Sequence, residues 1–60
     1  MHPRIRLRSK RGETGGSWLS DSCLPQAKRE LAEYQEEEPG EGWRLEVCGE
    51  LMNWHEYREN

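Results

Sequence analysis

The sequence predicts a small α+β domain, ordered β-β-α-β with a short tail element, in which one helix packs on one face of an antiparallel sheet. Residues 4–8 read RIRLR and residues 43–47 read WRLEV, and strict alternation of apolar and charged side chains is typical of a half-buried strand. Between them, apolar residues recur at helical spacing within residues 23–40. Pairing of sequential strands around one helix predicts a sheet ordered 2-1-3.

The helix is the longest element that the pattern predicts. Pro25 suits its first turn, where a missing N–H does no harm, and Pro39-Gly40 ends it. One apolar stripe runs along it at positions i, i+3, i+7 and i+10, formed by Leu24, Ala27, Leu31 and Tyr34. We expect this stripe to face the sheet.

The remaining segments carry weaker signals. Residues 10–16 contain three glycines and are predicted as a loop, and residues 17–22 as a second strand anchored by Trp18. The tail after Gly49 lacks β-branched residues, which favours a short helix or an irregular packed segment; a fourth strand is the main alternative. The predicted core consists of Ile5, Leu7, Trp18, Leu24, Ala27, Leu31, Tyr34, Trp43, Leu45 and Val47.

Composition restricts the class of protein. Sixty residues make a single domain, and a chain of this size buries only roughly 60% of the surface that its unfolded form exposes. No apolar run has the length of a membrane span. The N-terminus is basic but lacks the apolar stretch of a signal peptide, so we expect a cytosolic protein.

Catalytic and metal-binding patterns are weak. Cys23 and Cys48 do not form the disulfide framework of small secreted domains, and with His2 and His55 they match no zinc-binding spacing. We therefore expect two reduced thiols, no bound metal and no cofactor. His55 and Glu56 are adjacent, so their side chains point apart on a helix or strand, and no nucleophile accompanies them. The sequence predicts that the protein is not an enzyme.

Charge is distributed unevenly along the chain. Residues 1–12 carry +5 and residues 13–60 carry four bases against twelve acids, or −8, which sum to the net charge of −3. The basic segment is one candidate nucleic-acid contact, because several arginines and lysines at phosphates give unspecific, salt-sensitive affinity. Its residues are Arg4, Arg6, Arg8, Lys10 and Arg11.

The acidic residues of the helix are the other candidate surface. Lys28 and Arg29 lie in the first turns and Glu36 to Glu38 in the last, so the charges oppose the helix dipole at about 0.3–1 kcal/mol each. Such charges either serve solubility or form a binding surface whose carboxylates, about 5–6 Å apart, approximate the spacing of nucleic-acid phosphates. The candidate partner-binding residues are Glu30, Glu33, Glu36, Glu37, Glu38, Glu41, Trp54, Glu56 and Glu59.

In its order of motifs, the chain resembles small accessory proteins of bacteriophages and mobile elements. The resemblance covers residues 3–48: a basic strand (RIRLR), a Trp-bearing strand (SWLSDS), an A-x-x-E-L helix (AKRELAEYQ) and a returning strand (PGEGWRLEV). Within that group, an acidic α+β chain of this length looks like the anti-CRISPR inhibitors, several of which mimic duplex DNA. The resemblance assigns no site residue.

It implies a non-enzymatic inhibitor in the bacterial cytoplasm, as a monomer or homodimer. Such a protein would block the DNA-binding groove of a host protein, such as a CRISPR effector complex, and would bind neither a membrane nor a small-molecule substrate. A small nucleic-acid-binding protein that uses the basic N-terminal strand is the alternative.

Overall fold

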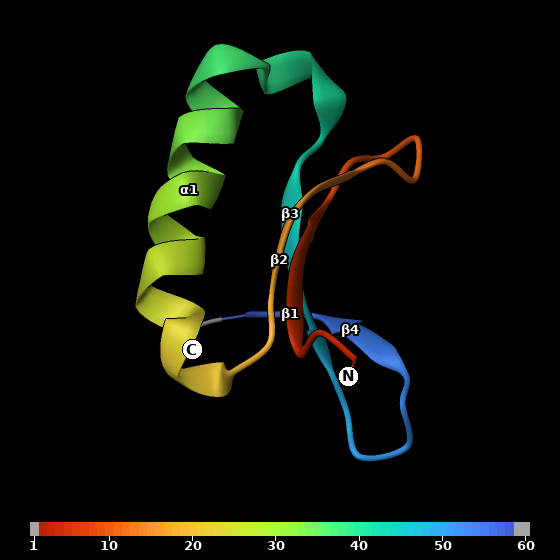
Figure 1. The fold of residues 1–60 in the computed structure, drawn as a ribbon. Helices are drawn as coiled ribbons and strands as arrows, with labels where there is room; N and C mark the ends of the chain where they lie inside the picture. Colours follow the sequence, from red (N-terminus) through yellow and green to blue (C-terminus); the bar gives the residue numbers. More distant parts are fainter. Residues whose placement is uncertain (1, 59–60) are drawn as a thin grey trace.

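The structure, a computed structural model, describes residues 2–58. All strand pairs in this range are antiparallel, and the strands lie in the order β2-β1-β3-β4. The helix α1 lies along one face of this sheet (Figure 1). The predicted α+β class and the 2-1-3 order are therefore confirmed, with one strand added beside β3. The elements are β1 (Ile5–Arg8), β2 (Thr14–Trp18), the 3-10 turn η1 (Asp21–Cys23), α1 (Leu24–Glu37), the 3-10 turn η2 (Pro39–Glu41), β3 (Arg44–Cys48) and β4 (Trp54–Glu56).

The first strand lies at the centre of the sheet, and its alternation explains this position. Ile5 and Leu7 are 1% and 0% exposed and pack in one cluster with Ala27 of α1. Burying each large apolar side chain contributes about 1.5–3 kcal/mol. Ile5 is paired with Trp18 of β2 on one side and with Val47 of β3 on the other. The helix therefore covers the apolar face of β1 and leaves its arginine face open.

The helix packs on the sheet through the predicted stripe. Ala27 is buried, and Leu24, Leu31 and Tyr34 are partly buried against the core cluster. Regular α-helix ends at Glu37, directly before the predicted Pro39-Gly40 stop and its preceding residue, and residues 39–41 form η2. The backbone N–H of Glu38 still donates to the carbonyl of Tyr34 at 2.8 Å. Glu38 itself has non-helical dihedral angles, because the ring of the following proline disfavours the helical conformation at that residue.

The second strand begins and ends earlier than predicted, at residues 14–18 instead of 17–22. Glycine is required at position 15 of the strand because Tyr34 of α1 and Trp43 leave no room for a side chain there. A Cβ on Gly15 would lie 2.6 Å from Cε2 of Tyr34 and 2.9 Å from Cζ3 of Trp43. Gly15 is the extra residue of an irregular pairing beside Leu7 and Arg8, as in a β-bulge, and its carbonyl accepts a 2.6 Å hydrogen bond from the Tyr34 hydroxyl.

The tail forms a strand, so the expected helix or irregular segment is wrong and the alternative of a fourth strand is confirmed. Trp54 is paired with Cys48, and Glu56 with Glu46. A tight turn closes the hairpin, with Gly49 N–H donating to the Asn53 carbonyl at 2.7 Å. The backbone groups along the edge of β3 thereby find partners, and this pairing outweighs the low strand propensity of the tail.

The core is the one that the pattern predicts, with one addition. The fully buried part contains Trp43 and Leu45 besides the residues above, and Tyr57 packs against it from beyond β4. The Tyr34 ring meets the Trp43 ring edge-on, with centroids 4.8 Å apart and planes at 77°. The indole N–H of Trp43 is buried and has no hydrogen-bond partner within residues 2–58. All ten predicted core residues are buried or partly buried in this cluster: Ile5, Leu7, Trp18, Leu24, Ala27, Leu31, Tyr34, Trp43, Leu45 and Val47.

Candidate functional site

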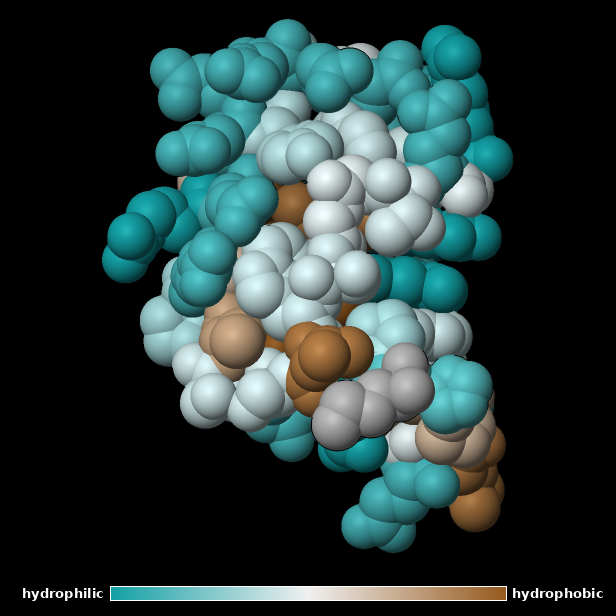
Figure 2. Space-filling model, in the orientation of Figure 1, coloured by the Kyte–Doolittle hydropathy of each residue, from teal (hydrophilic) through white to brown (hydrophobic). Residues whose placement is uncertain are grey.

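The C-terminal half of α1 presents an acidic surface to solvent. Figure 2 shows hydrophilic side chains over this upper end of the molecule. Its four exposed glutamates make no ion pair or side-chain hydrogen bond with any residue in the range 2–58. The helix C-terminus carries partial negative charge, so these carboxylates are repelled by the dipole as well as by one another. We call this group the acidic helix end; it consists of Glu33, Glu36, Glu37 and Glu38.

Two further predicted glutamates flank the acidic helix end but are half-buried. Glu30 accepts a long hydrogen bond of 3.5 Å from the Gln26 amide. Glu41 of η2 lies 3.4 Å from a guanidinium nitrogen of Arg11, and its carbonyl accepts a 3.0 Å bond from the Lys10 N–H. The β1–β2 loop therefore brings positive charge directly beside η2. This contact reduces the negative charge that Glu41 presents to solvent.

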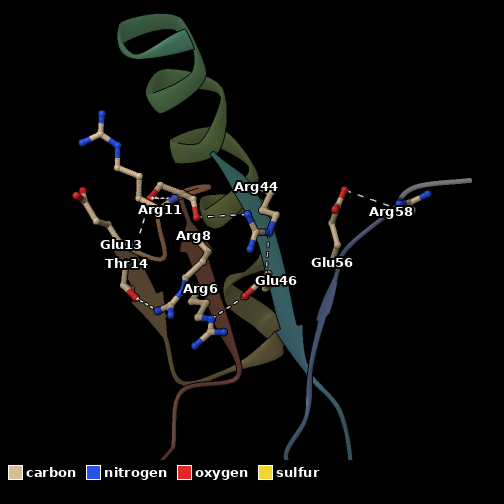
Figure 3. A network of polar contacts seen from close by, with 10 residues as sticks. Arg6, Arg8, Arg11, Glu13, Thr14, Arg44, Glu46, Glu56 and Arg58 are labelled. Atoms are coloured by element: carbon tan, nitrogen blue, oxygen red, sulfur yellow. Dashed lines mark hydrogen bonds and ion pairs between the residues drawn. The ribbon is translucent and has the colours of Figure 1, made fainter. Parts of the chain in front are cut away.

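The opposite face of the sheet carries a network centred on Glu46 (Figure 3). Glu46 is 8% exposed and accepts hydrogen bonds from Arg6 Nε at 2.8 Å and Arg44 Nε at 3.0 Å. Burial raises the pKa of the Glu46 carboxyl, but these two hydrogen bonds and the two positive charges outweigh burial and hold the pKa below its usual value. One carboxylate therefore binds two arginines from adjacent strands.

The other bases of the N-terminal segment make separate contacts with different parts of the chain. Arg4 is 3.6 Å from Asp21 of η1. Arg8 donates to the Thr14 hydroxyl at 2.8 Å, and Lys10 is exposed in the loop. Three of the five predicted nucleic-acid contacts are thus in ion pairs, Arg4 with Asp21, Arg6 with Glu46, and Arg11 with Glu41. Part of the positive charge of this segment is therefore offset by carboxylates of the same chain, and Arg6 shares its carboxylate with Arg44.

The aromatic member of the predicted binding set lies away from the helix. The Arg6 guanidinium is 4.0 Å from the centroid of the Trp54 ring, which places Trp54 on the open face of the sheet. Glu56 follows on β4, with Arg58 4.0 Å away. The predicted partner-binding residues are therefore divided between two faces of the molecule. Glu59, also predicted, lies outside the described residues.

Sequence reasoning missed Arg44 and Glu46 as functional neighbours of β1. The signal was present, because the predicted 2-1-3 order places the 43–47 strand beside residues 4–8. Within that pairing, Arg6 is opposite Glu46 and Arg8 is opposite Arg44. The sequence pattern does not give the register, that is, which residue of one strand lies opposite which residue of the other. A register shift by one residue would place all these side chains on the other face.

The described residues contain no cluster with the geometry of a metal centre. No group of three or more His, Cys, Asp or Glu side chains within residues 2–58 is arranged to hold an ion. Cys23 and Cys48 are both free thiols, and Cys48 is buried. His55 is exposed on β4.

Comparison with protein families, with curated proteins and with solved structures found no match to this chain. The one α-helix of the described chain is too short and too polar to cross a lipid bilayer. The charge and geometry of the surfaces described above are the observations that bear on function.

Proposed function

We propose that the protein is a non-enzymatic inhibitor of phage or mobile-element type that acts in the bacterial cytoplasm. Its acidic helix end enters the basic, nucleic-acid-binding groove of a host protein, such as a CRISPR effector complex, and excludes DNA from it. The binding is electrostatic and steric, so it requires no cofactor, metal or small-molecule substrate. Complementary charge gives fast association that weakens as salt concentration rises.

One contrast carries this proposal. Glu33, Glu36, Glu37 and Glu38 have no ionic partner within residues 2–58, whereas three of the five N-terminal bases are already in ion pairs. A charge that is already paired attracts an external partner less strongly than an unpaired one, because the opposite charge beside it cancels part of its field. The acidic helix end is therefore the more available charged surface.

The geometry of the acidic helix end also suits a groove that binds a polyanion. Residues three and four apart on a helix stand about 5–6 Å from one another, so Glu33, Glu36 and Glu37 form a row on one side of the helix, with Glu38 just beyond its end. The row lies in the last turns of α1, and the helix dipole adds negative potential there. A basic groove on another protein would relieve this repulsion, and the relief adds to the free energy of binding.

The alternative, direct binding of nucleic acid, depends on the open face of the sheet. Arg8 and Arg44 are directly opposite each other, and like charges in that position disfavour the pairing unless an anion lies between them. Arg44 is nevertheless bound to Glu46, and Arg6 shares the same carboxylate. These contacts make nucleic-acid binding the second candidate.

A pair of charge-matched variants tests the proposal. Glu33→Lys/Glu37→Lys changes the acidic helix end, and Glu13→Lys/Glu50→Lys makes the same change in net charge elsewhere on the exposed surface. The immobilised protein is expected to retain a nucleic-acid-binding protein from bacterial lysate. Added duplex DNA should release that protein, and the first variant alone should fail to retain it.

Two outcomes would contradict the proposal. Equal retention by both variants would mean that location on the helix does not matter. Tight binding of DNA by the unmodified protein at physiological salt, in a gel-shift titration, would favour the open sheet face instead. In that case Arg8→Gln should weaken DNA binding and reduce its dependence on salt, while the helix variant should tighten it.

A further inference from the structure

The β3–β4 hairpin ends in two large apolar side chains that nothing in the described chain covers. Leu51 is 87% exposed and Met52 54% exposed. Figure 2 shows this hydrophobic tip at the lower end of the molecule, opposite the acidic helix end. Large apolar side chains grouped at a protruding turn are typical of contact sites with another protein. We call residues 50–52 the hairpin tip.

The backbone of the hairpin tip holds these side chains outward in a strained conformation. Met52 has φ of 60°, in the left-handed region that favours glycine and asparagine. The Met52 N–H donates to the Gly49 carbonyl at 3.0 Å, so the loop is a turn followed by one left-handed residue. Hairpin loops of three residues usually carry glycine at that position. A methionine there stabilises the turn less than glycine would, which points to a role outside the monomer.

An apolar cavity lies at the same end of the molecule. It is open to solvent, has a volume of about 240 Å³, and is lined by residues at the start of β1, in η1, at the start of α1 and at the end of β3. A cavity of about 150 Å³ is large enough to hold benzene, so this one has room for a leucine side chain. Its described lining residues are Arg4, Ile5, Asp21, Leu24, Val47 and Cys48.

We propose that the protein forms a symmetric homodimer in which Leu51 of each copy inserts into this cavity of the other. The cavity lies close to the hairpin tip, because Cys48 lines the cavity and the tip begins two residues later. A two-fold axis between the hairpin tip and the cavity would place Leu51 of each copy at the cavity of the other. Two-fold interfaces use one self-complementary patch in this way.

Charge at the rim of the cavity also favours a second copy as the occupant. The Arg4 side chain is 43% exposed and lies 3.6 Å from Asp21, a distance that leaves guanidinium N–H donors for a further acceptor. Glu50 is exposed and directly precedes Leu51 in the hairpin tip. When Leu51 enters the partner's cavity, Glu50 reaches the rim where the partner's Arg4 lies. The apolar Leu51 side chain and the adjacent Glu50 carboxylate thus face an apolar cavity whose rim carries Arg4 beside Asp21; the guanidinium has five N–H donors, so it can bind Glu50 as a second carboxylate partner.

Sedimentation equilibrium tests the dimer directly, over a range from micromolar to several hundred micromolar protein. The unmodified protein is expected to reach twice the monomer mass of 7.1 kDa at the upper end. Leu51→Asp should remain monomeric throughout and keep its circular-dichroism spectrum, because Leu51 makes little contact within its own chain. Ala32→Asp, which adds the same charge to the exposed surface of α1, should dimerise like the unmodified protein. A monomer at every concentration, or a dimer of Leu51→Asp, would overturn the proposal.

A charge exchange tests the orientation of the interface. Arg4→Glu alone and Glu50→Arg alone should each weaken the dimer about tenfold or more, since each places like charges at the rim. The double variant should recover most of the loss, as in other double-mutant cycles of contacting residues. If the double variant dimerises no better than the two single changes predict together, Glu50 does not meet Arg4 and the proposed interface is wrong.

The dimer is independent of the acidic helix end. Glu33→Lys/Glu37→Lys should leave the sedimentation of the protein unchanged, and Leu51→Asp should still retain the host protein in the capture experiment. Failure of one proposal is therefore distinguishable from failure of the other.

Discussion

The first strand and the last turns of the helix carry opposite charges, and they differ in whether those charges are paired. On the open face of the sheet, Arg6 is bound to Glu46 on one side and lies over Trp54 on the other. At the acidic helix end, Glu36 and Glu37 are exposed and make no ion pair within residues 2–58. The side chains of the basic segment therefore take part in contacts within the protein, whereas the carboxylates of the acidic helix end project into solvent.

This difference teaches that formal charge and available charge are separate quantities. By formal charge, the N-terminal segment is the more concentrated of the two, with +5 in twelve residues. In the folded protein, four of its five basic side chains contact a side chain of the same chain, namely Arg4, Arg6, Arg8 and Arg11. Substitutions in the two regions should therefore behave differently, and matched pairs of variants measure the difference.

The largest expected difference involves two glycines. Gly15→Ala introduces a Cβ that overlaps Tyr34 and Trp43, and forced overpacking of this kind costs about 1–3 kcal/mol. Gly40→Ala, beside the acidic helix end, meets nothing within 4 Å and should change stability by no more than about 1 kcal/mol, in the stabilising direction. Urea unfolding measures both. If Gly15→Ala is as stable as Gly40→Ala, Tyr34 and Trp43 do not pack closely on β2.

The next difference involves two glutamates. Glu46→Ala leaves Arg6 and Arg44 side by side without their shared acceptor, and loss of hydrogen bonds to charged groups costs about 1.5–3 kcal/mol. Glu37→Ala removes an unpaired carboxylate next to the negative end of the helix and should be neutral or slightly stabilising. The same urea titration compares them. If Glu46→Ala is also neutral, the network on the sheet does not contribute to stability.

Acid should affect the two regions differently as well. Because the pKa of Glu46 is lowered in the folded protein, its contribution is complete above the ordinary glutamate value of 4.5 and is lost as the pH falls through the lower folded value. Stability of the unmodified protein should therefore fall more steeply below about pH 4.5 than that of Glu46→Gln. Thermal unfolding from pH 7 to pH 2 measures this. Parallel curves for the two proteins would contradict the lowered pKa.

The smallest expected effect is a gain. Glu37→Lys places a cation in the last turn of α1, where the dipole favours positive charge, and should stabilise the protein by about 0.3–1 kcal/mol at low salt. Glu13→Lys, in the β1–β2 loop, lacks that dipole and should change the melting temperature less. A loss of stability in Glu37→Lys would show that this carboxylate has an internal role.

Periodicity predicted the parts of the fold that depend on side-chain burial. The stripe from Leu24 to Tyr34 and the alternation in residues 4–8 and 43–47 led to the observed core, because burial follows the helical and strand periods directly. The two errors arose where backbone pairing decides the structure. Gly15 has no side chain to show a pattern, and β4 forms because the β3 edge offers partners.

The candidate site was predictable in composition but not in arrangement. The acidic residues of α1 share a helix, so their proximity follows from spacing alone. The place of Trp54 beside Arg6 depends on two strand pairings, β1 with β3 and β3 with β4, each of which needs its register. A sequence contains no local signal for two successive registers. For this reason the sequence pattern groups Trp54 with the glutamates of the helix, although it lies on the open face of the sheet.

The central position of β1 has a consequence for how the chain folds. Ile5 is paired with Val47, 42 positions later in the sequence, whereas β1 and β2 are joined by a short loop. The β1–β2 hairpin can close locally within microseconds, but the centre of the sheet must wait for a long loop to close. Folding should therefore be limited by the docking of β3, and substitutions in Leu45 should slow folding more than substitutions in β4. During synthesis, the apolar face of β1 remains uncovered until α1 has been made, and its edge toward β3 remains unpaired until residue 48 has followed.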